Sequence, residues 1–268
     1  MRTCVLASGS EGNVTYVETA KHKILLDIGM NVKYIKEKLS ELSIDLANID
    51  YVFITHVHDD HIKALKNLIK KYNPTICLSP KMYSELEVLK DYDKILLYGE
   101  SLQFDDFSVE IIKTSHDTSD SRSFIVTSDN KSVVYLTDTG FINQKYFPKL
   151  QNKDVYLFES NHDIEMLLNG PYPKWLKDRV IGPYGHLSNK DSSIYLAKII
   201  GPNTKKIILT HLSHKNNTEE IALATIKETF TEYDIAFDDI QCAKQKEKSE
   251  LIELWLKLYA WAKSKKNI

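Results

Sequence analysis

Four hydrophobic runs of this chain end in a histidine or an aspartate. They are residues 53–55 before His56, 111–115 before His116, 135–137 before Asp138 and 208–210 before His211. The runs are short and rich in β-branched and aromatic residues, which predicts strands. Imidazole and carboxylate groups at the tips of strands are suitable ligands for zinc or manganese. The pattern therefore predicts a sheet with metal ligands along one edge, which is typical of a binuclear metallohydrolase.

The bulk properties are those of one globular domain. The 268 residues are 43% hydrophobic and 27% charged, with no apolar run near the roughly 20 residues of a membrane helix and no secretory segment at the start. A net charge of −2 excludes a general polycation, so any nucleic acid must bind through a local patch and the metals. The cysteines Cys4, Cys77 and Cys242 lack metal-site spacing and are odd in number, which favours a reducing cytoplasm.

The order of predicted elements favours an α/β fold. Strands are predicted at 2–6, 15–19, 23–27, 51–54, 75–78, repeatedly between 95 and 136, at 155–159 and at 206–209. Helices are predicted at 32–42, 62–72, from Pro80, at 164–168, 173–180, 191–200, 218–233 and 249–262. We expect a four-layer αββα sandwich in one domain, 1–268, with two sheets face to face, helices outside and the ligands meeting at one edge.

The strongest local signal is His56-Val57-His58-Asp59-Asp60-His61. His56 and His58 alternate and can share one metal. Asp60 and His61 follow the turn and can serve a second ion, roughly 3.5–4 Å away as in two-metal hydrolases. The alternative is a polar loop that is histidine-rich by chance.

This hexapeptide resembles the HxHxDH signature of the metallo-β-lactamase superfamily. His116, Asp138 and His211 match the later ligands of that superfamily in order and in context. The resemblance implies two divalent metal ions, Zn²⁺ or Mn²⁺, and a bridging hydroxide as the nucleophile. It implies one metal held by His56, His58 and His116, another held by Asp60, His61 and His211, and Asp138 bridging the two.

Each later ligand has a simpler interpretation. His116 is also compatible with a surface histidine at a turn, and Asp138 with a turn former. His214 competes with His211, which we favour because it directly follows its strand. Asp27 ends a strand and either orients a ligand histidine or only begins a turn.

Further motifs resemble the YycJ/WalJ group, an exonuclease and phosphodiesterase branch of the superfamily. They are residues 7–13, 159–163, 185–189 and 211–217. The resemblance implies a 5′-to-3′ DNA exonuclease that acts on phosphodiester bonds.

Several residues of these motifs are candidate substrate contacts. Small residues such as Ser8 and Ser10, next to glycines, let backbone N–H groups approach a phosphate, although an ordinary turn between strands has the same composition. Asn13, Asn161 and His162 are further candidate substrate contacts.

Two residues are candidate catalytic groups. Asp60 is expected to orient the attacking hydroxide. His186 is expected to protonate the leaving oxygen or to hydrogen-bond a phosphate oxygen, unless its loop only caps a helix.

The sequence departs from the group's pattern at two places. Glu11 stands where serine is usual and adds negative charge beside the expected phosphate path, and residues 119–123 lack the usual proline and glycine. The stretch between Asp138 and His211 is too short for the extra domain of the long-RNA nucleases, which disfavours that subgroup.

We therefore expect a cytoplasmic nuclease that acts on DNA rather than RNA, with no membrane association. One alternative is a hydrolase of small esters, lactones, lactams or thioesters, which predicts an apolar pocket and no salt-sensitive affinity for nucleic acid. Another is a non-catalytic nucleic-acid-binding protein, which the complete ligand set disfavours. The oligomeric state stays open.

Overall fold

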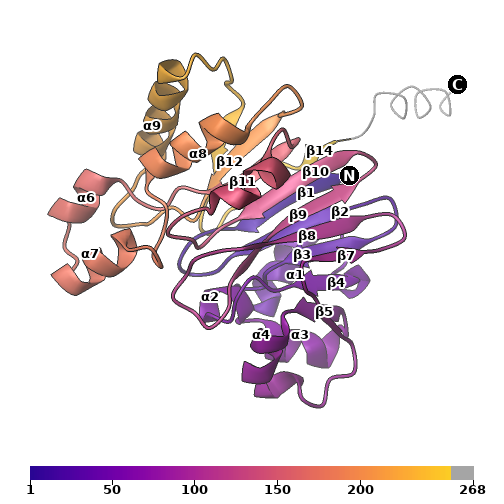
Figure 1. The fold of residues 1–268 in the computed structure, drawn as a ribbon. Helices are drawn as coiled ribbons and strands as arrows, with labels where there is room; N and C mark the ends of the chain where they lie inside the picture. The colour runs from indigo at the N-terminus through magenta and orange to yellow at the C-terminus, as the bar shows by residue number, and fades with distance from the viewer. Residues whose placement is uncertain (255–268) are drawn as a thin grey trace, which may run out of the picture.

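Two seven-stranded sheets form the centre of the fold, as a computed structural model that describes residues 1–254 shows (Figure 1). The first sheet has the order β14-β1-β2-β3-β4-β5-β6, and its strands are Ile252–Glu253, Arg2–Ala7, Val14–Glu18, Lys23–Leu26, Tyr51–Phe53, Thr75–Leu78 and Ile95–Leu97. The second has the order β13-β12-β11-β10-β9-β8-β7, and its strands are Ile240–Cys242, Lys206–Thr210, Val155–Glu159, Lys131–Leu136, Arg122–Ser128, Ser108–Lys113 and Ser101–Gln103.

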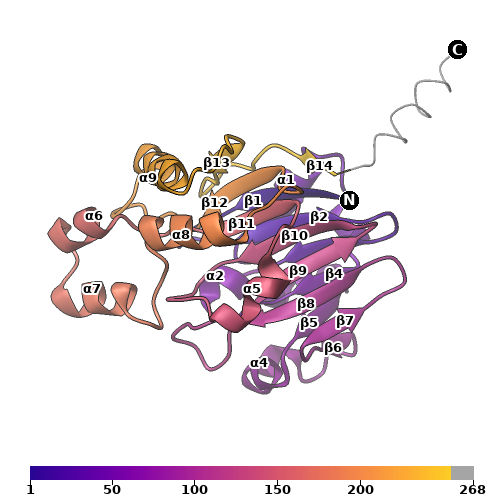
Figure 2. The ribbon, with the colours of Figure 1, turned by 45° about the horizontal axis from the view of Figure 1, so that its top comes forward.

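Helices cover the outer faces of both sheets (Figures 1 and 2). The first half contains α1 (Val32–Ser40), η1 (Leu46–Asn48), α2 (Asp59–Ile62), α3 (Leu65–Lys71), α4 (Pro80–Glu85) and η2 (Glu87–Leu89). The second half contains η3 (Gln144–Tyr146), α5 (Phe147–Leu150), α6 (Ile164–Asn169), α7 (Lys174–Ile181), α8 (Asn189–Ile199) and α9 (Glu219–Glu232). The αββα sandwich predicted from the sequence is confirmed.

The strand directions place the functional edge. Each sheet combines an antiparallel part with a parallel part, in which β3, β4, β5 and β6 or β10, β11, β12 and β13 are neighbours. The carboxyl ends of parallel strands lie at one edge of a sheet, where α/β proteins usually place their sites. The residues that follow β3, β4, β10, β11 and β12 therefore meet at one side of the sandwich.

Strand alternation explains the nearly continuous hydrophobic runs of the second sheet. Val133 and Tyr135 of β10 belong to the core between the sheets, and Val134 and Leu136 belong to the core under α8 and α9. A strand that is covered on both faces needs apolar side chains on both, which removes the polar alternation of a half-exposed strand.

Most predicted elements are present within a few residues of their expected bounds, but two helices differ. The helix predicted over 62–72 begins only at Leu65, as α3, because Ile62 ends the separate helix α2. The helix predicted over 249–262 is wrong at its start, because Ile252–Glu253 pairs with β1 as strand β14, and residues 255–262 lie outside the described part. Strand β13 was not predicted. None of the described helices is long and apolar enough to cross a membrane.

Candidate metal centre

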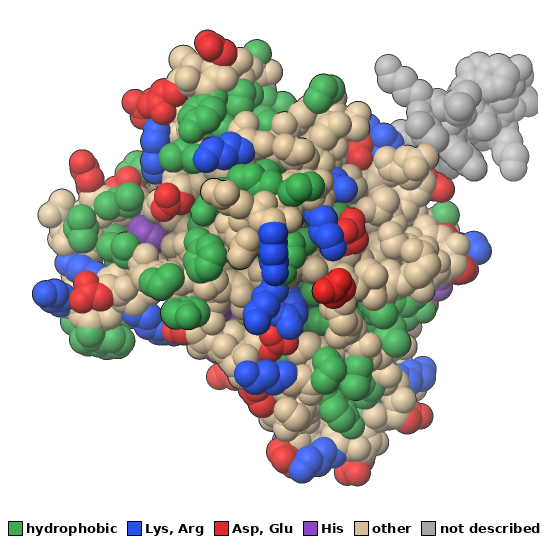
Figure 3. Space-filling view, viewed as in Figure 1, with side chains coloured by type: hydrophobic (Ala, Val, Ile, Leu, Met, Phe, Trp, Pro, Cys, Tyr) green, Lys and Arg blue, Asp and Glu red, His purple; other side chains and the backbone are tan. Residues whose placement is uncertain are grey.

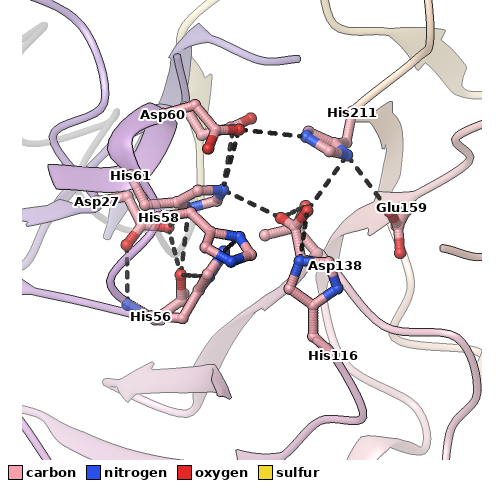
Figure 4. A network of polar contacts seen from close by, with 12 residues as sticks. Asp27, His56, His58, Asp60, His61, His116, Asp138, Glu159 and His211 are labelled. Atoms are coloured by element: carbon pink, nitrogen blue, oxygen red, sulfur yellow. Dashed lines mark hydrogen bonds and ion pairs between the residues drawn. The ribbon is translucent and has the colours of Figure 1, made fainter. Parts of the chain in front are cut away.

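The structure gathers all the predicted metal ligands at the edge of the sandwich (Figure 4). We call His56, His58 and His116 the first ligand set, and Asp60, His61 and His211 the second ligand set. Within each set, one ligand atom per residue lies within 4.8 Å of the others. Asp138 lies between the sets, with Oδ2 3.2 Å from His61 Nε2 of the second set and Oδ1 4.0 Å from His116 Nε2 of the first set.

The donor atoms suit a pair of divalent cations. The first set offers three imidazoles and the second two imidazoles and a carboxylate, which zinc and manganese accept. His211 Nε2 is buried and has no hydrogen-bond partner among the described residues, although buried polar atoms are nearly always paired. His56 Nε2 and His58 Nδ1 face each other at 3.1 Å. An ion between such groups would satisfy them, so the residues fit the implied metals. Metal binding by these particular residues stays a prediction.

Asp27 holds His61 in place. Its Oδ2 lies 2.7 Å from His61 Nδ1, which leaves Nε2 directed at the centre. The same fully buried carboxylate accepts hydrogen bonds from the backbone N–H and hydroxyl of Thr55, both at 2.8 Å, and from Tyr135 at 3.0 Å. Such a carboxylate fixes the tautomer and orientation of a ligand imidazole. Of the two interpretations of Asp27, the structure favours the orienting one.

Other ligand rings are held by weaker partners. His116 Nδ1 lies 3.2 Å from the Gly185 carbonyl oxygen, and His56 Nδ1 lies 3.0 Å from the Thr55 hydroxyl. These contacts also direct the remaining ring nitrogen toward the centre, but they bring no charge.

Burial and neighbouring charges set opposite protonation in the two sets. Burial lowers the pKa of His56 well below its usual value and lowers that of His116 as well. Burial also disfavours the charged forms of His61 and His211, but nearby carboxylates outweigh this effect. Asp27 and Asp138 raise the pKa of His61. The pKa of His211 is raised to about 10 by Asp138, Asp60 and Glu159. His56 and His116 are therefore neutral near pH 7, whereas His61 and His211 hold protons that a metal must displace.

Three residues of the centre have left-handed backbones. Asp27, Asp138 and His211 have φ values of 58°, 55° and 58°, and each lies within two residues of a strand end. For a residue with a side chain, such a conformation costs on the order of 1–3 kcal/mol and is often found at functional sites. The turn redirects each side chain from its strand into the shared edge.

Glu159 is a functional candidate that our reading of the sequence did not assign. It ends β11 and is fully buried, and its Oε1 lies 2.6 Å from His186 Nδ1 and 3.3 Å from His211 Nδ1. Burial raises the pKa of a carboxyl group, but His186 and His211 bring that of Glu159 down to about 2. The signal was available, because Glu159 ends a hydrophobic strand just as the ligands do.

Three of the five predicted substrate contacts, Ser8, Asn13 and Asn161, have side-chain hydrogen-bond partners inside the protein, whereas His162 Nδ1 has none among the described residues. Ser8, Asn13, Asn161 and His162 are buried, and Ser10 is exposed. The Ser8 hydroxyl accepts a hydrogen bond from His211 N–H at 2.8 Å, and Asn161 Nδ2 donates to the His211 carbonyl oxygen at 2.9 Å. Ser8 and Asn161 therefore hold the backbone of His211 in place. Contact of any of the five residues with substrate stays a prediction.

The loop before β2 is closed by its own asparagine. Asn13 Oδ1 accepts from Gly9 N–H at 2.9 Å, and its Nδ2 lies 3.1 Å from His61 Nε2. Gly12 has a φ of +157°, and a Cβ there would lie 2.5 Å from the Gly29 carbonyl oxygen, so this glycine serves close packing. Glu11, the departure noted above, pairs with Lys246 at 2.5 Å, which offsets its negative charge.

The choice between His211 and His214 has a clear geometric answer. His211 is buried at the centre, and its Nε2 lies 3.8 Å from Asp60 Oδ2. His214 is exposed three residues further on and belongs to none of the ligand groups. The geometry favours His211, as did its position directly after the strand.

Known proteins resemble this chain over most of its length. The model of the metallo-beta-lactamase superfamily matches residues 8–211. An exodeoxyribonuclease WalJ of Streptococcus pneumoniae is 37% identical over 238 residues, which cover 86% of this chain and 88% of the relative. An exodeoxyribonuclease YycJ of Bacillus anthracis is 33% identical, covering 85% and 88%. Among solved structures, the metallo-beta-lactamase fold protein YhfI of Bacillus subtilis has a TM-score of 0.68 at 17% identity, covering 93% and 99%, and supports the fold alone.

Proposed function

This chain belongs to the metallo-β-lactamase superfamily, and from that premise we propose that it is a metal-dependent nuclease that removes nucleotides from the 5′ ends of DNA. One observation carries the proposal: the carboxylate of Asp138 lies 3.2 Å from His61 of the second set and 4.0 Å from His116 of the first set. At the same edge, His186 Nδ1 lies 3.5 Å from this carboxylate. The DNA specificity is supported by the relatives that are named exodeoxyribonucleases and match over more than four-fifths of this chain.

The first ligand set would hold one cation, the second set another, and Asp138 would contact both. Zinc and manganese are the candidates, because both accept imidazole and carboxylate ligands. When bound, the two cations supply positive charge that stabilises the phosphoryl oxygens and lowers the pKa of water.

Two side chains of the centre would move or hold protons. The neighbouring imidazoles of His211 and His61 lower the pKa of Asp60 against the effect of burial, so its carboxylate is ionised and can orient the attacking water. His186 has Nδ1 against Glu159, which leaves Nε2 to donate a proton to the departing oxygen as the P–O bond breaks. The Glu159 carboxylate would hold the His186 ring in a fixed orientation during the transfer.

We place this reaction in the cytoplasm. Cys4, Cys77 and Cys242 are all free, as expected in a reducing compartment.

A metal-titrated assay tests the proposal. The protein is incubated with end-labelled single- and double-stranded DNA and RNA, and separately with bis-p-nitrophenyl phosphate. We expect mononucleotides to be released one at a time from the 5′ end of DNA, only with divalent metal. Turnover of a lactam, lactone or thioester without any phosphodiester cleavage would reject the nuclease and favour the small-molecule hydrolase.

A further inference from the structure

A cleft opens beside the first ligand set. It has a volume of about 350 Å³, and its lining includes the ligand His116 together with Phe141, Tyr184, Tyr146, Lys113 and Lys145. A second hollow, of about 530 Å³, shares Phe141 with the first and continues past Tyr195 and Lys198. Figure 3 shows Lys and Arg side chains together with hydrophobic ones near the middle of the face seen in Figure 1.

Two aromatic side chains at this cleft are unusually exposed. Phe141 is 42% exposed and Tyr184 is 63% exposed. A packed aromatic side chain buries roughly 150–250 Å² of its surface. Leaving two of them exposed at one cleft therefore costs the folded protein part of the stability that their burial would provide. Exposed apolar groups that gather in one place mark binding sites.

The backbones of these two residues are tied to the ligand loop. Gly140 N–H donates to the Ser115 carbonyl oxygen at 2.8 Å, directly before Phe141. On the other side, the Ser115 hydroxyl donates to the Pro183 carbonyl oxygen at 2.8 Å, directly before Tyr184. Phe141 and Tyr184 are therefore carried on backbone that is anchored next to His116, rather than on loose loops.

The packing of these loops leaves no room for a side chain at Gly140. A Cβ there would lie 2.4 Å from the Pro183 carbonyl oxygen and 2.5 Å from that of Gly182. The three chain segments around Ser115, Gly140 and Pro183 are thus in close contact, which fixes the positions of both aromatic residues relative to the metal ligands.

The charges at the cleft favour an anion. Lys113 and Lys145 are exposed, and neither forms an ion pair with a carboxylate within residues 1–254. Lys145 Nζ lies 4.9 Å from the Tyr146 ring centroid. The acidic group of the lining, Asp120, is paired with Arg122 at 2.7 Å. The cleft therefore combines aromatic faces with uncompensated positive charge.

We propose that this cleft binds two unpaired nucleotides of a DNA strand, with one base stacked on Phe141, the other on Tyr184, and backbone phosphates near Lys113 and Lys145. The inference rests on the proposed function and specifies its substrate as a single-stranded or frayed end. Aromatic faces combined with lysines are the common means of binding single strands, whereas a base inside a duplex already has both faces stacked on its neighbours.

The test compares normal and abasic DNA strands. The metal-loaded wild-type enzyme is given two 5′-labelled oligothymidylates, one of which lacks the bases on either side of the first linkage to be cleaved. We expect a higher KM for the abasic strand, by roughly 5- to 150-fold per lost stacking contact. The variant carrying Phe141→Ala and Tyr184→Ala should show the raised KM with both strands and should no longer distinguish them.

Two matched variants complete the design. Trp175→Ala removes an aromatic residue that is 67% exposed on α7 and outside the cleft, and should keep the wild-type KM ratio. Phe141→Tyr combined with Tyr184→Phe preserves the aromatic faces and should also keep it. Equal KM values of the wild type for the two strands, or full discrimination by the double alanine variant, would overturn the inference while DNA hydrolysis itself upheld the proposed function. Absence of hydrolysis of every strand by the wild type would instead reject the proposed function.

Discussion

The two ligand sets differ in the groups behind their imidazole rings. In the second set, His61 is backed by the carboxylate of Asp27 and His211 by that of Glu159. In the first set, the backing groups of His56 and His116 are a hydroxyl and a backbone carbonyl. The fold thus builds two neighbouring sites from similar residues but with different local charge.

The difference predicts unequal behaviour of the two cations. The carboxylates make the second set more strongly attractive to a cation, and for the same reason they stabilise protons on its histidines. In the first set, His56 and His116 are neutral, so a metal that binds them competes little with protons. A carboxylate next to a ligand histidine therefore strengthens the attraction for a cation and also makes metal binding more dependent on pH.

The largest effect is expected from Asp138→Ala, because this carboxylate is common to both sites. We expect both cations to be lost and hydrolysis to fall by more than about 100-fold, beyond the range typical of an outer partner of a ligand. His58→Ala should also abolish hydrolysis but should leave the second cation bound. Elemental analysis and rates measure both effects, and a preserved thermal transition shows that the fold persists. Full activity of either variant would reject the metal assignment.

Asp27→Asn should act on the second site alone. The amide keeps the size of the side chain but removes the charge behind His61, so metal affinity at that site should fall by about 10- to 100-fold. Titration with a competing chelator should show one weakened site and one unchanged site. Equal weakening of both sites would contradict the separate roles of the two sets.

Lowering the pH should empty the second site before the first. Because the pKa values of His61 and His211 are raised, these rings lose their protons only as the pH rises toward those values. The metal affinity of the second site should therefore increase by about tenfold per pH unit for each proton that the metal displaces. The lowered pKa values of His56 and His116 keep those rings neutral above about pH 6.5, so affinity there should be nearly constant. Chelator competition between pH 6.5 and 8.5 measures both slopes, and parallel slopes would refute this difference.

The smallest effect is expected from Asn161→Ala. The variant loses one hydrogen bond to the His211 backbone, equivalent to about 1 kcal/mol, so the second site should weaken by less than about tenfold. The control is His214→Ala, which removes an exposed histidine and should change neither metal binding nor rate. A raised KM for DNA with unchanged metal affinity would instead make Asn161 a substrate contact.

The sequence was sufficient to predict the fold class and the side chains that gather at the edge of the sandwich. Short hydrophobic runs that end in His56, Asp138 or His211 indicate both a strand and a candidate metal ligand. The residue types of the run predict the strand, and the imidazole or carboxylate at its end is the functional group that a metal needs. The same rule extends to Glu159, which also ends a strand.

The break between α2 and α3 was decided by tertiary contacts. A continuous helix would join Ala64 N–H to the Asp60 carbonyl oxygen. Instead, Ala64 N–H donates to the Ile28 carbonyl oxygen at 3.0 Å, and the Asp60 carbonyl oxygen accepts from Asn13 N–H at 2.8 Å. Both bonds tie the turn of the second set to loops of the first sheet, and helical periodicity gives no sign of them.

What the sequence determined by itself is the set of chemical groups and the strands that carry them, because each is written in a few adjacent residues. The fold alone sets the surroundings of each group: Asp27 beside His61, Glu159 beside His186, and a cleft rather than the core for Phe141. These pairings join residues that are far apart along the chain. They depend on which strands lie side by side and on which loops cross the edge, and no local pattern encodes that arrangement.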